Sequence, residues 1–323
     1  MPFAPQTIFP KKDLHRYLTQ PKRLDRIDLM KTGASELISW ISNLFGKGLT
    51  QLLTSNKFEI ERIAVRMADT QNSSAARKLR IIAGQLDKND WSEKLCIDQL
   101  MSLYFLSRAL LKIEHLPLLV QSELLQICGV NWRKKDLEWT EPINDHWLCL
   151  NQEEKWVENI RQSSSWFWGV HTGIFACYNQ FVFRFAPFDH PIKTGKIYRG
   201  NFKFFPSSTP INGYASEDFQ PSDIPFQWTV EEFNKMNYKT ADYIARNPIK
   251  TEWPVIMHLS HFQSSPSLLT QLQEPHSKRL LDLLNFAAVD PELWVFGLWT
   301  HSVFSPVSLL NKEGVFPLDQ WVN

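Results

Sequence analysis

The sequence predicts an α+β fold, in which an N-terminal helical bundle precedes an antiparallel β-rich domain with additional helices and a C-terminal β-hairpin or small sheet. Two patterns predict this order. Before residue 132 the apolar residues recur at helical steps of three and four, and after it short aromatic and β-branched runs alternate with polar or glycine turns. We therefore divide the chain into a basic N-terminal arm (1–34), a helical bundle (35–131) and a β-rich domain (132–323). The bundle and the β-rich domain could form one packed unit.

The first 34 residues carry seven Lys and Arg against three Asp, a net charge of +4, and are interrupted by proline and glycine. We interpret this arm as a solvated linker or docking tail, and leave open that it binds phosphate groups or a partner. The basic residues that we expect to make such contacts are Lys11, Lys12, Lys22, Arg23 and Arg26.

The bundle is predicted to hold about five helices with charged outer faces. A stripe of Leu, Trp and Ile opens the first helix, Asn89 and Asp90 cap the fourth, which is expected to be the longest, and Pro117 opens the last. No repeat period near that of a helical solenoid is found. The expected helices are 35–54, 58–67, 75–84, 89–113 and 117–129.

The β-rich domain is predicted to begin with short antiparallel strands at 147–150, 165–169, 174–178, 181–185, 195–198 and 202–206. A proline-rich surface loop follows at 207–228. A helix then begins at Thr229, because Thr229 and Glu232 form the Thr-x-x-Glu pattern of a capping box. A further helix is expected at 278–287, and the last strands at 294–299, 303–309 and 315–318.

Composition and targeting signals indicate a cytoplasmic protein. Lys and Arg number 35 against 34 Asp and Glu, so no overall charge attracts nucleic acid or an anionic membrane over a distance. The N-terminus has neither the order of a signal peptide nor a lipidation motif, and the most apolar stretch, 95–120, is interrupted by charges and a proline, so we expect no membrane helix. The four cysteines, Cys96, Cys128, Cys149 and Cys177, form no CxxC pair and are interpreted as reduced core thiols.

Motifs for nucleotide binding, for hydrolase chemistry and for zinc peptidases are absent from the sequence, so we expect no enzyme, no cofactor and no metal. His258 and His261 would share one face if their segment were helical, but no third ligand lies nearby in the sequence, and we interpret both as ordinary polar positions. Asp189 and His190 fit a proline-flanked turn better than a catalytic pair.

Aromatic side chains in the predicted strands allow two interpretations. Trp166 and Trp168, together with nearby arginines, would suit the stacking of unpaired bases. Such strands more often pack against helices in a core, and thirteen tryptophans in the chain favour that interpretation. We retain Trp166 and Trp168 as candidate contacts for a partner or for nucleic acid.

Several segments recur in the order and spacing of a known family. They are Arg66-Met67-Ala68-Asp69-Thr70-Gln71, Ala76-Arg77-Lys78-Leu79-Arg80, Trp132-Arg133-Lys134-Lys135, Trp147-Leu148-Cys149-Leu150, Trp166 with Gly169, Phe185-Ala186, Phe204-Phe205-Pro206, Trp253-Pro254, Phe296-Gly297-Leu298-Trp299, Pro306-Val307-Ser308, Gly314 and Pro317-Leu318. Over residues 35–323 the chain resembles the region that follows the finger in bacterial SWIM zinc-finger family proteins. The finger itself, a C-x-C pair with a later C-x-H, is absent, so no finger residue can be carried over.

The resemblance implies a function without catalysis. Genes of this family commonly lie beside those of a MoxR-type AAA ATPase and a von Willebrand factor A domain protein, which are therefore the expected protein partners. We expect an adaptor or scaffold protein in such an ATPase-associated assembly. The alternatives are a nucleic-acid-binding protein that uses the basic arm and exposed aromatic residues and, third, an enzyme whose site is dispersed along the chain.

Overall fold

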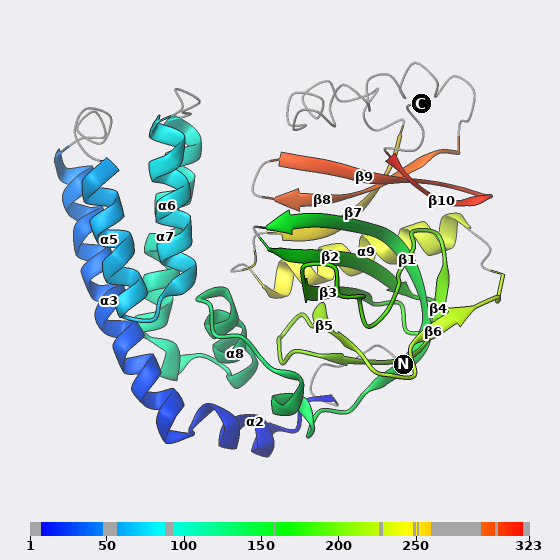
Figure 1. Cartoon of the computed structure of the whole chain (residues 1–323), viewed down its shortest axis with the longest axis horizontal. Coiled ribbons are helices and arrows are strands. Elements are labelled where there is room, and N and C mark those ends of the chain that lie inside the picture. The colour runs from blue at the N-terminus through cyan, green and yellow to red at the C-terminus, as the bar shows by residue number, and fades with distance from the viewer. Residues whose placement is uncertain are drawn as a thin grey trace. The chain divides into compact units, whose positions relative to one another are not determined.

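The structure is a computed structural model that describes residues 8–47, 57–87, 93–157, 159–225, 229–247, 250, 252–259, 292–300 and 303–318. The chain divides into two compact units. The helical unit comprises Phe9–Trp139 with Pro206–Ser208, and the barrel unit comprises Met1–Ile8, Thr140–Phe205 and Thr209–Asn323. Figure 1 shows the helices and strands of each unit. The predicted α+β class is confirmed, with seven α-helices among the described residues.

The helical unit contains six of these helices. They are α2 (Lys11–Leu18), α3 (Pro21–Lys47), α5 (Lys57–Asp69), α6 (Ser73–Asp87), α7 (Glu93–Leu111) and α8 (Leu118–Ile127). Two short 3₁₀ helices, η1 (Ile113–His115) and η2 (Lys134–Leu137), complete the unit. The apolar stripes of α3, α5, α6 and α7 meet in one core, where Leu37, Met67, Leu79 and Leu100 are buried. The apolar residues whose spacing predicted the helices are thus the residues that pack in the core of the bundle.

The predicted basic arm, expected to be a solvated linker or docking tail, forms α2 and the first part of α3. Leu14, Tyr17, Leu18, Ile27 and Met30 are buried within it, at the spacing of an amphipathic helix that the many charges obscured. Helix α3 runs through the expected boundary at residue 34 and, with 27 residues against 19 in α7, is longer than the helix predicted to be the longest.

A glycine lets α3 lie close to the turn between α5 and α6. A Cβ atom built on Gly33 would come within 2.1 Å of Thr70 Oγ1. Asn72 Nδ2 from the same turn donates a hydrogen bond to the Met30 carbonyl at 2.9 Å. Gly33 is therefore required in the helix despite the low helix propensity of glycine, because the side chains of Thr70 and Asn72 fill the space that a Cβ atom would take.

Five strands of the barrel unit close on themselves. They are β1 (Ile143–Val157), β2 (Ile160–Gly169), β3 (Phe175–Phe183), β4 (Ile197–Phe204) and β5 (Asn212–Ala215), and β6 (Gln220–Ser222) extends the sheet beyond β4. The order β1-β2-β3-β5-β4 returns to β1 through a β1–β4 pairing, and only β3 and β5 run parallel. This is the connectivity of the OB-fold barrel.

Strand β1 pairs with two neighbouring strands and so closes the barrel. Its first half pairs with β4 and its second half with β2, and the register shifts at a bulge between Cys149 and Asn151. Such bulges bend a strand and increase its twist, as a closed barrel needs. The interior is filled by aromatic side chains, including Trp147, Phe167 and Phe202, which are fully buried.

The predicted strands are longer in the structure. The pairs predicted at 174–178 and 181–185, and at 195–198 and 202–206, merge into β3 and β4, and the predicted loop 207–228 contains β5 and β6. Polar residues that were interpreted as turns lie inside these strands, where they form hydrogen bonds. The Gln180 side chain, for example, bonds to the backbone of His190 at 2.8 and 2.9 Å.

A second sheet and a helix pack against the outer face of the barrel. The sheet has the antiparallel order β10 (Gly314–Pro317), β9 (Val303–Asn311), β8 (Trp294–Thr300) and β7 (Glu252–His258), and the helix is α9 (Val230–Arg246). Thr229 caps α9 as predicted, since its Oγ1 accepts a hydrogen bond from Glu232 N at 3.2 Å. The predicted helix at 278–287 lies outside the described residues.

The core between these layers holds four of the thirteen tryptophans. Trp166, Trp168, Phe175, Trp253 and Phe296 are all buried in one cluster. Trp168 meets Phe175 edge to face with ring centroids 4.9 Å apart. Its indole Nε1 donates to Glu232 Oε2 at 3.4 Å, which satisfies the polar end of a buried ring.

Candidate binding surface

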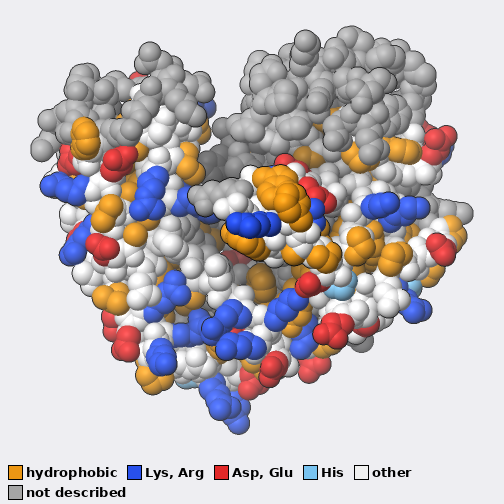
Figure 2. Space-filling view, viewed as in Figure 1, with side chains coloured by type: hydrophobic (Ala, Val, Ile, Leu, Met, Phe, Trp, Pro, Cys, Tyr) orange, Lys and Arg blue, Asp and Glu red, His pale blue; other side chains and the backbone are white. Residues whose placement is uncertain are grey.

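Six large apolar side chains stand exposed where β1, β2 and β3 end together. We call this surface the hairpin patch, and it consists of Trp156 (53% exposed), Val157 (52%), Ile160 (45%), Phe181 (62%), Phe183 (60%) and Phe185 (86%). In Figure 2, hydrophobic side chains gather over the free ends of β1 and β2, with Lys and Arg side chains beside them. Isolated exposed apolar residues are common, but a contiguous group marks an interaction site or an aggregation hazard.

The strand register holds the patch in place. Val157 pairs with Ile160, and Ile160 pairs with Phe183, so these three side chains lie side by side on the outer face of the barrel. Phe181, two residues before Phe183, shares that face. On the opposite face, the rings of Trp156 and Phe185 meet with centroids 5.9 Å apart. The patch therefore wraps both sides of a preformed hairpin.

The charges around the patch cancel. Residues 153–185 contain three Glu against one Lys and two Arg. Arg161 is partly committed to the fold, since its Nη2 donates to the Ala186 carbonyl at 3.2 Å and its guanidinium lies 4.4 Å from the Phe188 ring centroid. A surface of this kind has little electrostatic attraction for phosphate groups.

The two tryptophans predicted as contacts do not lie at the surface. Trp166 is 4% exposed and Trp168 fully buried. In the structure they belong to the core between the barrel and the second sheet, so this part of the expected contact set is corrected to packing residues. The aromatic residues of β1 and β3 in the hairpin patch are exposed instead. The alternation of residues in the sequence could not separate the exposed from the buried aromatic residues, because both occur in similar strands.

The basic residues predicted as contacts separate into two groups. Lys11 and Lys12 on α2 and Lys22 on α3 are exposed. Arg23 instead lies 3.5 Å from the ring centroid of Tyr17, which stacks on Trp132 at 4.0 Å, and burial lowers the pKa of Arg23 to about 10.

Arg26, the other arginine of the expected set, also has a structural partner. Its Nη2 donates to the Gly129 carbonyl at 3.2 Å, just after α8 ends. The two arginines therefore hold the start of α3 in the helical unit, and the exposed basic surface of the expected set reduces to its three lysines.

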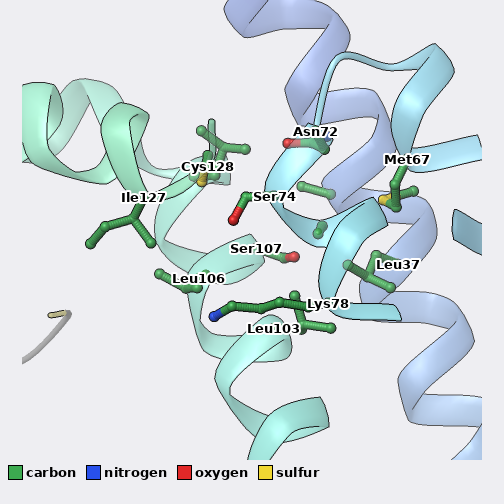
Figure 3. A pocket seen from close by; sticks show the side chains of 13 residues that line it. Leu37, Met67, Asn72, Ser74, Lys78, Leu103, Leu106, Ser107, Ile127 and Cys128 are labelled. Carbon is green, nitrogen blue, oxygen red and sulfur yellow. The ribbon is translucent and has the colours of Figure 1, made fainter. Parts of the chain in front are cut away.

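A small cavity lies inside the helical unit. It measures about 20 Å³, which is room for about one water molecule. Figure 3 shows Lys78 reaching past Leu106, with Ser74 and Cys128 nearby. Burial raises the pKa of the Cys128 thiol to about 12 and lowers the pKa of Lys78. The cavity is too small for a substrate, and its thiol is not poised as a nucleophile.

A broader groove of about 800 Å³ runs along β4 and β6 of the barrel unit. Its ionisable lining consists of Lys193, Lys196, Tyr198, Asp223 and Glu313. Burial raises the pKa of Tyr198 to about 12, and its hydroxyl accepts a hydrogen bond from Lys193 N at 2.8 Å. These residues do not pair a nucleophile with a base, so the groove could accommodate a small molecule but offers no evident catalytic chemistry.

Metal-ligating side chains converge once among the described residues, at Asp145, His146 and His171. The histidines considered from the sequence do not form such a group: His258 ends strand β7, instead of lying on a helix, and His261 is outside the described residues. His190 has its backbone N–H bonded to Gln180 Oε1 at 2.9 Å, in keeping with the turn predicted for it.

Comparison with known proteins bears on the helical unit. Residues 25–128 match the family model of the SWIM-associated four-helix bundle domain. The match runs from within α3 to the end of α8, and supports the resemblance to SWIM proteins for this third of the chain. No curated protein and no solved structure matches the chain. Within the described residues, no helix has the length and apolar character needed to cross a bilayer.

Proposed function

We propose that this chain is a non-catalytic adaptor or scaffold protein that binds a partner protein through the hairpin patch. The observation that supports the proposal is the patch itself, six apolar side chains between 45% and 86% exposed on one end of a barrel. Protein interfaces are enriched in aromatic residues and depleted of charge at their centres, as this surface is. Since the strand ladder already holds these side chains, little ordering is needed on binding.

The partners that we propose follow from the resemblance, which the matching helical domain supports. They are a MoxR-type AAA ATPase and a von Willebrand factor A domain protein of a bacterial cytoplasm. Four buried cysteines that form no disulfide are in keeping with a reducing compartment.

Binding to a purified MoxR-type AAA ATPase and to a purified von Willebrand factor A domain protein tests the proposal. Changing Trp156 and Phe183 to Ser should weaken capture of one of them at least about 30-fold, because central aromatic residues commonly contribute 2 kcal/mol or more. Tyr238→Ser on α9 removes a ring that is even more exposed, at 76%, elsewhere in the barrel unit and should leave binding unchanged. Equal capture of the wild type and the double variant would overturn the proposal.

A second candidate function, binding of single-stranded nucleic acid, is favoured by the barrel connectivity. OB-folds bind oligonucleotides across strands two and three, where Phe181 and Phe183 are exposed. The balanced charge around the patch counts against it. An oligonucleotide titration decides: affinity that falls steeply with salt and is lost in the Trp156 and Phe183 variant would favour nucleic acid over a protein partner.

A further inference from the structure

Two histidines meet on the barrel unit, away from the hairpin patch. His146 lies on β1, and His171 lies in the turn between β2 and β3. His146 Nδ1 and His171 Nε2 are 3.3 Å apart, and their rings are inclined at 71°. Asp145 offers a carboxylate oxygen, and one ligand atom from each of the three residues lies within 4.8 Å of the others.

Asp145 fixes the position of both histidines. It is 2% exposed, and its Oδ1 accepts hydrogen bonds from His146 N at 2.6 Å and His171 N at 3.1 Å. Its Oδ2 accepts from Thr172 N at 2.9 Å and from Thr172 Oγ1 at 2.5 Å. Four donors saturate the carboxylate, so Asp145 acts as a buried negative charge that locks the turn and not as a ready ligand.

The separation of the two ring nitrogens fits a zinc ion. Two nitrogens each about 2.05 Å from a tetrahedral Zn²⁺ lie about 3.3 Å apart, which is the separation observed. The same separation suits an N–H···N hydrogen bond between the rings, which would hold the two nitrogens at the spacing of the ion before it binds. We propose that His146 Nδ1 and His171 Nε2 bind a Zn²⁺ ion whose remaining positions are filled by water.

The surroundings define what kind of site this is. His171 is exposed, which gives the ion access from solvent, whereas His146 Nε2 is buried without a hydrogen-bond partner, so Nδ1 is the nitrogen available to the metal. The charge of Asp145 favours a cation, and Arg199, the exposed cross-strand neighbour of His146, opposes it. Two imidazoles with open water positions make an exchangeable site, in contrast to the four-ligand structural sites of zinc fingers.

Calorimetric titration of the tag-free full chain with Zn²⁺ alone tests the inference. We expect one equivalent bound, with affinity at least about 10-fold weaker in His171→Ala and in His146→Ala. His15→Ala, which removes an exposed histidine on α2, should change nothing. Arg199→Ala should tighten binding, because it removes a like charge near the ion. Absence of saturable binding, or an affinity unchanged by His171→Ala, would overturn the proposal.

A spectroscopic readout keeps the test independent of folding defects. Cu²⁺ accepts imidazole ligands readily, and its electron paramagnetic resonance spectrum reports bound nitrogens. The wild type should show two imidazole nitrogens on one Cu²⁺, and the exposed-site variant His171→Ala should show one or none. Circular dichroism establishes that His171→Ala is folded. A copper spectrum identical in the two proteins would contradict the assignment.

Discussion

Glu123 on α8 accepts hydrogen bonds from two serines that lie 84 and 85 residues further along the chain. Ser207 Oγ is 2.6 Å from its Oε1, and Ser208 Oγ is 2.8 Å from its Oε2. The Glu123 side chain is buried, and Pro206 beside the serines accepts a further bond from Ser122 at 2.8 Å. The helical unit thus includes three residues, Pro206–Ser208, from the middle of the β-rich half of the sequence.

Removing this carboxylate should destabilise the helical unit. Glu123→Ala leaves two hydroxyls without their acceptor, and we expect a loss of about 1–3 kcal/mol in the free energy of unfolding. Urea unfolding followed by circular dichroism measures it. Ser207→Ala with Ser208→Ala should give a similar loss, and the triple variant should lose much less than the sum. Full additivity would show that the contacts do not form.

Two glycines of α3 should respond to alanine in opposite directions. Gly33→Ala forces a Cβ against Thr70 Oγ1, so we expect a loss of about 1–3 kcal/mol. Gly46→Ala is the matched control in the same helix, because nothing lies within 4 Å of its Cβ position, and it should stabilise by about 0.5–1 kcal/mol. Thermal unfolding of both variants measures the difference. Equal shifts would contradict the close approach of α3 to the α5–α6 turn.

The turn after β2 should depend on the Asp145 charge. Asp145→Asn replaces one acceptor oxygen by a donor, and we expect a loss of about 1.5–3 kcal/mol, since hydrogen bonds to charged groups are strong. Hydrogen exchange of the His171 and Thr172 amides, measured with a chelator present, should accelerate. Asn144→Ala, whose side chain contacts Asn201 at the surface, is the neighbouring control and should have a small effect. Unchanged protection in Asp145→Asn would contradict this role.

The thiols of the native protein should resist alkylation. Cys96, Cys128, Cys149 and Cys177 are all buried, and burial raises the pKa of Cys128 and of Cys177 to about 12 and that of Cys149 still further. At about pH 8.5, where an ordinary thiol is half ionised, labelling should remain slow in buffer and become rapid in urea. Counting labelled thiols by mass spectrometry checks this. Rapid labelling without urea would place a thiol at the surface.

Local pattern predicted the class of fold but not its closure. The helices from 58 to 127 and the C-terminal strands were confirmed because each carries its own periodicity. The first 34 residues were misjudged, since Leu14, Tyr17 and Leu18 form a helical stripe too short to stand out among the charges. The β1–β4 pairing and the parallel β3–β5 contact join distant segments, and no local signal encodes them.

Site residues were harder to predict for the same reason. Trp156 and Trp166 both lie in aromatic strands, but Trp156 is exposed at the free end of the β1–β2 hairpin, whereas the second sheet covers Trp166. His146 and His171 are 25 positions apart and meet through the register of β1 with β2. A search for histidines that face each other across a hairpin could have found them, whereas motif spacing could not.

The position of Pro206–Ser208 has a consequence for synthesis on the ribosome. A nascent chain that has just emerged as far as Trp139 has every helix from α2 to α8 but lacks the hydroxyls that satisfy Glu123. Glu123 can form these two hydrogen bonds only after β1 to β4 are translated, because Ser207 and Ser208 follow β4 in the sequence. Maturation of the two halves is therefore interleaved in time, although each has a core of its own.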